Sequence, residues 1–291
     1  SGLTIDFIQS LFFYLFGVNW YAYIFHSSIF NSLISLIIYF YFLNLKIDKT
    51  ISLFLTCCFS ILAYTISGTP FVDHHAIFFL LISTILLIKV INDEKNYLWF
   101  LIVLFFFLSF FTKQVPASYT ILIQGFLIIF YIYYEKKLII LNYIVLSIFI
   151  VIFIFASFLF YFNIDFQDFY IQYIDYPRSI GESRFENLDV SLNSFFNKYK
   201  FILIPLIFTL LLKFRRIRGE NEKFLKKEFY TFSLLICFVL SAIFHQLMTK
   251  NQIYIYFLVP ILFGSLLGEL RLINKRFRVL VSTLIIFSIF L

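Results

Sequence analysis

Long apolar runs separated by short polar gaps cover almost the whole chain. A run of 17 residues, such as 50–66, reaches only about 25 Å as a helix, a little short of a hydrocarbon core of about 30 Å. We therefore expect the ends of several spans to lie a few residues away. The pattern predicts an all-α, polytopic membrane bundle with about ten spans, at residues 26–45, 50–66, 75–91, 97–111, 118–134, 138–162, 200–213, 229–248, 253–270 and 277–291.

Two further segments are predicted to have a role of their own. Residues 6–17 carry aromatic and aliphatic side chains broken by a few polar ones, which predicts a helix lying in the membrane interface within an outer segment 1–25. Residues 163–199 form the longest gap, and their aromatic content argues against disorder, so we expect a functional outer loop. All of 1–291 is expected to form a single transmembrane domain.

The composition supports this interpretation and excludes others. The chain is 62% hydrophobic, 23% aromatic and only 13% charged, which is too apolar for an ordinary soluble globule. The net charge of +7 comes from short clusters between apolar runs, so it indicates membrane topology and not nucleic-acid binding. The cysteines Cys57, Cys58 and Cys237 fall within spans and offer neither a disulfide framework nor a metal-ligand spacing. No cofactor is evident, and nothing in the sequence supports a divalent metal.

The distribution of basic residues predicts the orientation of the spans. When the gaps are assigned alternately to two sides, one side receives 17 of the 23 Lys and Arg residues. By the positive-inside rule this side is cytoplasmic, and its basic loop 213–228 is explained as a topology anchor that contacts anionic headgroups. All four histidines and several acids fall on the other, outer side. We therefore expect the functional site on the outer face.

The chain begins at Ser1 without a Met and ends at Leu291 inside an apolar run. This leads us to expect a fragment that is cut at both ends.

The strongest candidate site is the gap from Gly68 to His75, because it places Asp73, His74 and His75 between two apolar runs. A carboxylate cannot sit in lipid without a partner or water. Asp73 is a candidate base or histidine-orienting group, whereas the alternative is an N-cap of the following helix in the headgroup zone.

Lys113 and Gln114 join two spans on the outer side, where the positive-inside rule disfavours a lysine. The cation is well suited to hold a lipid-linked phosphate, with Gln114 adding donors to phosphate or sugar. The alternative is that Lys113 reaches the interface as a snorkelling side chain.

Two more outer clusters are candidates for substrate contact. The first cluster is a short turn with a lone lysine, which the positive-inside rule again disfavours on the outer side. The second cluster has two guanidinium groups, which either bind phosphate oxygens or pair with neighbouring acids. Their members are His245, Lys250, Asn251 and Gln252 in the turn, and Arg178 and Arg184 in the long loop.

The order of Phe13 to Gly17, Asn19 and Trp20, then the loop Gly68 to His74, then Lys113 and Gln114, resembles the GT-C superfamily of polytopic glycosyltransferases. It is most similar to the bacterial group of protein mannosyltransferases and lipid A aminoarabinose transferases. The resemblance covers about residues 1–135.

The resemblance implies transfer of a sugar from a polyprenyl-phosphate donor to a lipid, glycan or protein acceptor, on the periplasmic face of a bacterial inner membrane. It also implies that Asp73 and His74 match an acidic position of the second outer loop, that Lys113 contacts phosphate, and that 163–199 covers the site. The principal catalytic acid of such enzymes has no matching position here, so we expect it upstream of residue 1. The alternative from another class is a transporter or flippase of a lipid-linked glycan.

Overall fold

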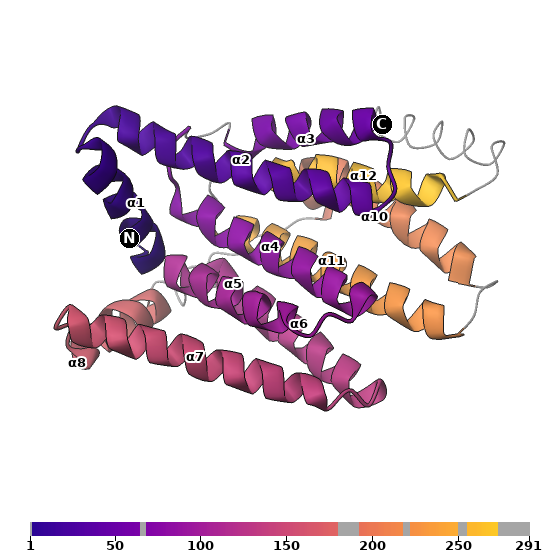
Figure 1. Cartoon of the computed structure of the whole chain (residues 1–291). Helices are drawn as coiled ribbons and strands as arrows, with labels where there is room; N and C mark the ends of the chain where they lie inside the picture. The colour runs from indigo at the N-terminus through magenta and orange to yellow at the C-terminus, as the bar shows by residue number, and fades with distance from the viewer. Residues whose placement is uncertain (1, 65–67, 180–191, 218–221, 250–254, 273–291) are drawn as a thin grey trace. The chain divides into compact units, whose positions relative to one another are not determined.

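The computed structural model describes residues 2–64, 68–179, 192–217, 222–249 and 255–272. Every regular element within these ranges is a helix (Figure 1). The elements are α1 (Leu3–Phe16), α2 (Trp20–Asn44), α3 (Lys49–Ala63), α4 (Val72–Asp93), α5 (Leu98–Thr112), α6 (Gln114–Tyr134), α7 (Ile139–Tyr161), α8 (Phe166–Tyr170), the π-helix η1 (Ile171–Asp175), α10 (Leu192–Ile217), α11 (Glu222–Thr249), the 3₁₀ helix η2 (Ile255–Phe257) and α12 (Leu258–Leu270).

The chain divides into two compact units. The first unit contains α1, α4 to α8, η1 and α11 from Lys227 onward. The second contains α2 from Ile24 onward, α3, α10, η2 and α12. The prediction of a single domain over 1–291 stays a prediction.

In the first unit α4 is the central helix, and its residues from Asp73 to Thr84 are all buried. Hydroxyl and amide side chains connect it to its neighbours: Ser109 of α5 donates to the carbonyl of Ala76 at 2.8 Å, and Ser83 donates to the carbonyl of Ile102 at 3.1 Å. Such hydrogen bonds suit a helix bundle in lipid, where apolar contact alone gives little preference for one helix over another.

The helices of the first unit alternate in direction, so that the unit has two chemically distinct ends. Asp73 in the first turn of α4 lies 2.7 Å from His245 near the end of α11, and we call this the Asp73 end. Glu94, directly after α4, lies 2.6 Å from Lys227 in the early part of α11, and we call this the Glu94 end. Three polar candidates from distant parts of the sequence, Asp73, Lys113 and His245, therefore gather at the Asp73 end.

In the second unit α12 packs against α10 and α3. Gly264 allows α12 to approach α2 closely, because a Cβ atom there would lie 2.2 Å from the ring of Phe42. Tyr41 and Ser265 join the same two helices through their hydroxyl groups, 3.1 Å apart.

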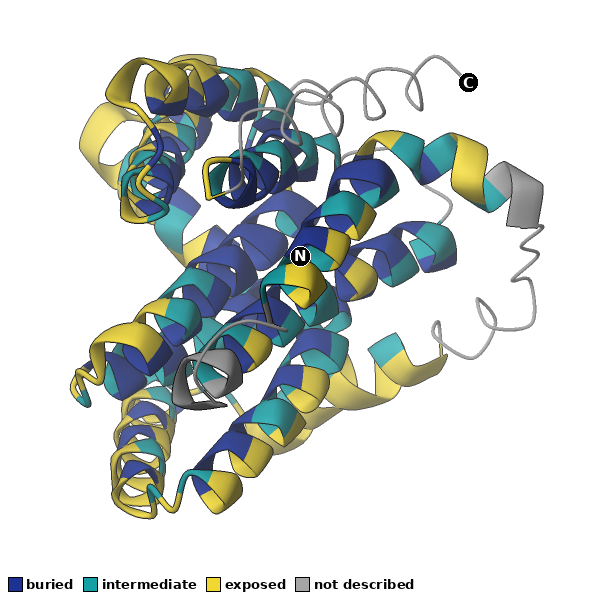
Figure 2. Ribbon diagram, turned by 90° about the vertical axis from the view of Figure 1, so that its right-hand side faces the viewer, coloured by how far each residue is buried: buried dark blue, intermediate teal, exposed yellow. Residues whose placement is uncertain are grey.

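Six of the described helices are long and apolar enough to cross a membrane: α2, α4, α6, α7, and the apolar parts of α10 and α11. Most helices carry a buried face and an exposed face (Figure 2). The exposed positions of α7 are almost all large and apolar, including Phe149 and Phe153. Such a surface fits contact with lipid, because a soluble protein rarely exposes so continuous an apolar face.

Nine of the ten predicted runs coincide with helices, and 277–291 lies outside the described residues. Three of the nine correspond to shorter apolar helices, α3, α5 and η2 with α12, so the count of ten spans stays a prediction. The run 200–213 was placed too short, because α10 extends over Leu192–Ile217 and includes basic residues that were assigned to the gaps.

The predicted interfacial helix is present as α1, which ends at Phe16 just before Gly17, whose φ is 79°. Its place in the membrane interface stays a prediction. The role of 163–199 as a long outer loop stays a prediction, and its described part is helical in α8, η1 and the start of α10. The aromatic residues explain this, because Phe169 and Tyr173 pack on the ring of Phe111 in α5.

A buried polar contact inside the first unit centres on Gln124, whose amide donates to Thr84 at 2.9 Å and to the carbonyl of Leu234 at 3.2 Å. We expect Gln124→Leu to lower the free energy of unfolding by about 1–2 kcal/mol, because two buried acceptors lose their donor. Thermal unfolding of the purified protein in detergent measures this. Leu122→Ala, at an exposed position of the same helix, is the control. Equal stability of Gln124→Leu and the unmodified protein would contradict the prediction.

Candidate functional site

Asp73 is a buried carboxylate held by two basic side chains from distant parts of the chain. Its Oδ1 lies 2.6 Å from Nζ of Lys113 and 2.7 Å from Nε2 of His245. Asp73 also lies in the first turn of α4, where the amide groups of the helix favour a negative charge. An acid that needs a partner in an apolar surrounding thus has two partners and a favourable helix position.

The alternative interpretation of Asp73 as an N-cap was wrong. The N-cap position of α4 is Phe71, and no side-chain hydrogen bond caps this helix. Asp73 is the second residue of the helix and directs its carboxylate to Lys113 and His245. Two charged tertiary contacts outweigh a local bond to one backbone amide.

Lys113 is the single residue between α5 and α6 and has an extended backbone, with φ −158° and ψ 125°. The side chain is 25% exposed, and its amine contacts Asp73 instead of simply extending toward an aqueous boundary. The snorkelling interpretation therefore does not describe this residue. The predicted position of Lys113 on the outer side calls for a compensating anion, and Asp73 supplies one within the protein.

His245 lies in the last part of α11 and is fully buried. Because Oδ1 of Asp73 is an acceptor, Nε2 of His245 must carry the hydrogen of the bond between them. The contact joins α11 to α4, as Lys113 joins the α5–α6 connection to α4. Three separate segments thus meet at one carboxylate.

A cavity of about 800 Å³ opens at the Asp73 end. Asp73, Lys113 and Gln114 line it, together with Asp6 of α1, whose side chain is exposed. The other polar residues of the lining are Thr112, Tyr119, Gln172, Tyr173 and Tyr176.

Tyr173 of η1 fixes two walls of this cavity. Its hydroxyl accepts a hydrogen bond from the backbone amide of Leu3, and its backbone carbonyl accepts one from Nε2 of Gln114 at 3.2 Å. Burial raises the pKa of Tyr173 to about 12, and the charge of Asp6 acts in the same direction. The hydroxyl group therefore stays neutral at physiological pH.

The start of α1 approaches α5 so closely that only glycine fits. A Cβ atom on Gly2 would lie 1.8 Å from the carbonyl oxygen of Thr112. This contact places Leu3 and Asp6 on the rim of the cavity. Asp6 is one of the few polar residues of the predicted helix 6–17, and the pattern of a helix does not reveal which distant residues its faces meet.

His74 and His75 are buried next to the cavity and are not part of its lining. His74 packs against the rings of Phe71 and Phe78, with ring centroids 5.5 and 6.0 Å away. His75 contacts the backbone carbonyl of Phe71 through Nδ1 at 3.1 Å. Successive helix residues point about 100° apart, so the two rings cannot share the direction of Asp73. Their predicted catalytic and substrate-binding roles stay predictions.

The remaining candidates divide into two groups. Arg178 is exposed and follows two residues of the cavity lining, Tyr176 and Pro177, without being part of the lining itself. The other four lie outside the described residues: Arg184, Lys250, Asn251 and Gln252. Among the residues that the structure describes, no three His, Cys, Asp or Glu side chains form a group that could hold a metal ion.

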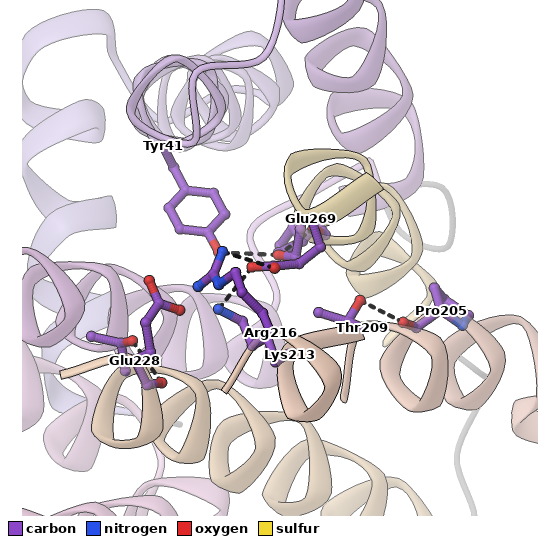
Figure 3. Close-up of polar contacts among 10 residues, drawn as sticks. Tyr41, Pro205, Thr209, Lys213, Arg216, Glu228 and Glu269 are labelled. Atoms are coloured by element: carbon purple, nitrogen blue, oxygen red, sulfur yellow. Dashed lines mark hydrogen bonds and ion pairs between the residues drawn. The ribbon is translucent and has the colours of Figure 1, made fainter. Parts of the chain in front are cut away.

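The second unit contains a charged cluster that the sequence analysis did not identify (Figure 3). Glu269 of α12 lies 2.9 Å from Nζ of Lys213 and 3.0 Å from a guanidinium nitrogen of Arg216, both in α10. The Glu269 side chain is 10% exposed. Lys213 and Arg216 were expected to act as topology anchors, and the structure adds a role for them in fastening α10 to α12.

Comparisons with family models, with curated proteins and with solved structures find no match to this chain. The interpretation of function therefore depends on the chemistry of the cavity at the Asp73 end.

The contact between Asp73 and Lys113 is open to a double-mutant cycle. We expect Asp73→Asn to lower the free energy of unfolding by about 3 kcal/mol, because it leaves Lys113 and His245 without their anion. Lys113→Gln should cost less, because His245 still contacts Asp73. The double variant should lose at least about 1 kcal/mol less than the sum of the two single variants.

Unfolding of the three variants in mixed micelles gives the coupling energy. Lys95→Gln, an exposed lysine at the Glu94 end, is the matched control for loss of a positive charge. Strict additivity of Asp73→Asn and Lys113→Gln would contradict an energetic coupling between these side chains.

Proposed function

We propose that this chain is a membrane glycosyltransferase, similar to the GT-C superfamily, that moves a sugar from a polyprenyl-phosphate donor to a lipid, glycan or protein acceptor. The observation that carries the proposal is the cavity at the Asp73 end. It combines a carboxylate, an ammonium group and an amide at the end of an apolar helix bundle. This combination suits a substrate that has an anionic phosphate, a polar sugar and a lipid anchor.

The proposed reaction requires two contributions from the protein, stabilisation of the leaving phosphate and acceptance of a proton. The acceptor oxygen attacks the anomeric carbon, the bond from this carbon to the phosphate oxygen breaks, and the electron pair leaves with the carrier phosphate. Lys113 and Gln114 are placed to stabilise that phosphate, because both line the cavity and both carry N–H donors. The proton of the acceptor passes to a carboxylate of the cavity.

Asp73 and Asp6 are the two acidic residues in the described lining, and they differ in environment. Asp73 is buried, and its Oδ1 contacts Lys113 and His245. We assign two roles to Asp73: it positions Lys113 and His245, and it contacts the acceptor. Asp6 is exposed and offers a second carboxylate as a proton acceptor.

The proposal includes a topology. The Asp73 end lies on the outer, periplasmic face of a bacterial inner membrane, and the Glu94 end lies in the cytoplasm. The six long helices, the three shorter apolar helices other than α1, and the apolar run 277–291 together make up the ten spans. The remaining short helix, α1, lies along the outer interface. The basic residues support this arrangement, because Lys95, Lys136, Lys137 and Lys227 are at or near the Glu94 end.

Cysteine labelling with a membrane-impermeant reagent tests the topology. In a variant without the three native cysteines, Gln167→Cys at the exposed α8 should be labelled in intact spheroplasts, whereas Lys95→Cys should be labelled only after permeabilisation. Labelling of position 95 but not of position 167 in intact spheroplasts would reverse the proposed orientation.

Binding of a polyprenyl phosphate tests the proposed donor site. Because loss of Lys113 alone leaves Asp73 with one partner fewer, the informative variant is the double change Asp73→Asn with Lys113→Ala. We expect it to weaken binding by about tenfold to a hundredfold relative to Asp73→Asn alone, because a charge-assisted contact to phosphate is lost. Lys113→Arg should retain part of the affinity.

The measurement is titration of the purified protein in nanodiscs, with Lys95→Ala as the control for general loss of charge. Absence of polyprenyl phosphate binding by the unmodified protein would reject the proposed function. Unchanged affinity in the double variant would remove Lys113 from the donor site.

A further inference from the structure

An apolar groove of about 510 Å³ is lined by residues of α5, α6 and α7 in the first unit. All of its lining residues are Ile, Leu, Val, Phe, Trp or Gly, and none carries a charge. On α5 the lining extends from Trp99 to Phe110, which corresponds to about 16 Å along a helix axis. The groove therefore has the length and the chemistry for a hydrocarbon chain lying along the helices.

Gly125 creates open space in the wall formed by α6. Ile121, Gly125, Ile128 and Ile132 share one face of this helix and line the groove. A Cβ atom added to Gly125 would meet no atom within 4 Å. The space next to Gly125 is thus available to a bound molecule.

The groove leads toward the polar cavity at the Asp73 end. Phe107 lines the groove and lies 4.3 Å, between ring centroids, from Phe111. The ring of Phe111 lies 5.9 Å from that of Tyr173, which lines the cavity. A layer of aromatic rings therefore separates an uncharged groove from a cavity that contains Lys113.

We propose that this groove holds the isoprenoid tail of a polyprenyl phosphate whose phosphate lies beside Lys113. The inference rests on the proposed function and adds the place of the lipid tail. A molecule with an anionic head and a long apolar tail matches both spaces, the cavity by charge and the groove by its uncharged walls. The walls bring together aromatic and branched side chains, which suit a branched tail.

The expected gain in binding affinity from this groove is moderate. Lipid tails are as apolar as the side chains of the groove, so moving a tail from the bilayer into the protein gives no hydrophobic driving force. Preference for the isoprenoid must come from shape and van der Waals contact. Filling the groove should consequently weaken binding of a long-chain ligand without abolishing it.

Gly125→Phe tests the inference, because the ring would occupy the groove from a position where its first atoms meet no neighbour. The matched control is Leu122→Phe, which adds a ring to a 72% exposed position of the same helix outside the groove. We expect Gly125→Phe to weaken binding of a long-chain polyprenyl phosphate by about tenfold. Geranyl phosphate, whose short tail does not extend as far as Gly125, about 16 Å along α6 from Gln114, should bind both variants as it binds the unmodified protein.

Gly125→Leu provides a smaller obstruction, and melting temperatures verify that each variant is folded. Binding of the long-chain ligand by the unmodified protein, with unchanged affinity in folded Gly125→Phe, overturns the groove assignment and leaves the proposed function intact. Equal weakening of both ligands also overturns it, because the effect would then lie at the phosphate. Competition by phosphatidic acid as strong as that by polyprenyl phosphate would identify a general phospholipid site. Failure of the unmodified protein to bind either prenyl phosphate rejects the proposed function itself.

Discussion

The contact of the buried Asp73 carboxylate with Lys113 and His245 determines the arrangement of the Asp73 end. Moving a carboxylate into an apolar surrounding costs several kcal/mol unless hydrogen bonds and opposite charges compensate. Here the compensation comes from the α5–α6 connection and from α11, so the same contacts that stabilise the acid also bring these segments to the start of α4. The cavity exists where they meet.

The same arrangement of one carboxylate with two basic groups occurs at two other places. Glu94 contacts Lys137 and Lys227, and Glu269 contacts Lys213 and Arg216. Glu94 lies directly after α4 and Glu269 lies in the last part of α12, and the partners of each acid belong to other segments of the chain. The charges thus act as connections between helix ends, where apolar packing between helices is least specific.

These clusters differ in strength because they differ in exposure. The side chain of Glu94 is 50% exposed, so solvent screens its pairs and their contribution to stability is small. The hydrogen bonds from Lys227 and Lys137 lower the pKa of Glu94, which keeps the group charged throughout the physiological range. Asp73 and Glu269 have side chains only 4% and 10% exposed, so loss of a partner has a larger effect there.

Much of the fold was predictable because lipid imposes it. Apolar runs predicted helices in the right places, and the rare polar residues in their gaps or near their ends identified Asp73, Lys113 and His245 as candidates. Their contacts were not predictable, since Lys113 is 40 and His245 is 172 residues from Asp73 in sequence. Local rules offered an N-cap role as the alternative for Asp73, and the tertiary contacts took precedence over it.

Lys113 shows how the structural and the proposed functional roles fit together in one side chain. An ammonium group has three hydrogens, so a bond to Asp73 leaves donors for a second anion. A phosphate bound there would lie near the Asp73 carboxylate, and the repulsion between the two anions would offset part of the attraction to Lys113. Binding in such a site would be weaker than at an isolated lysine. In the proposed function, the carrier phosphate would therefore be released more readily after transfer, and the ion pair would supply this balance without an additional residue.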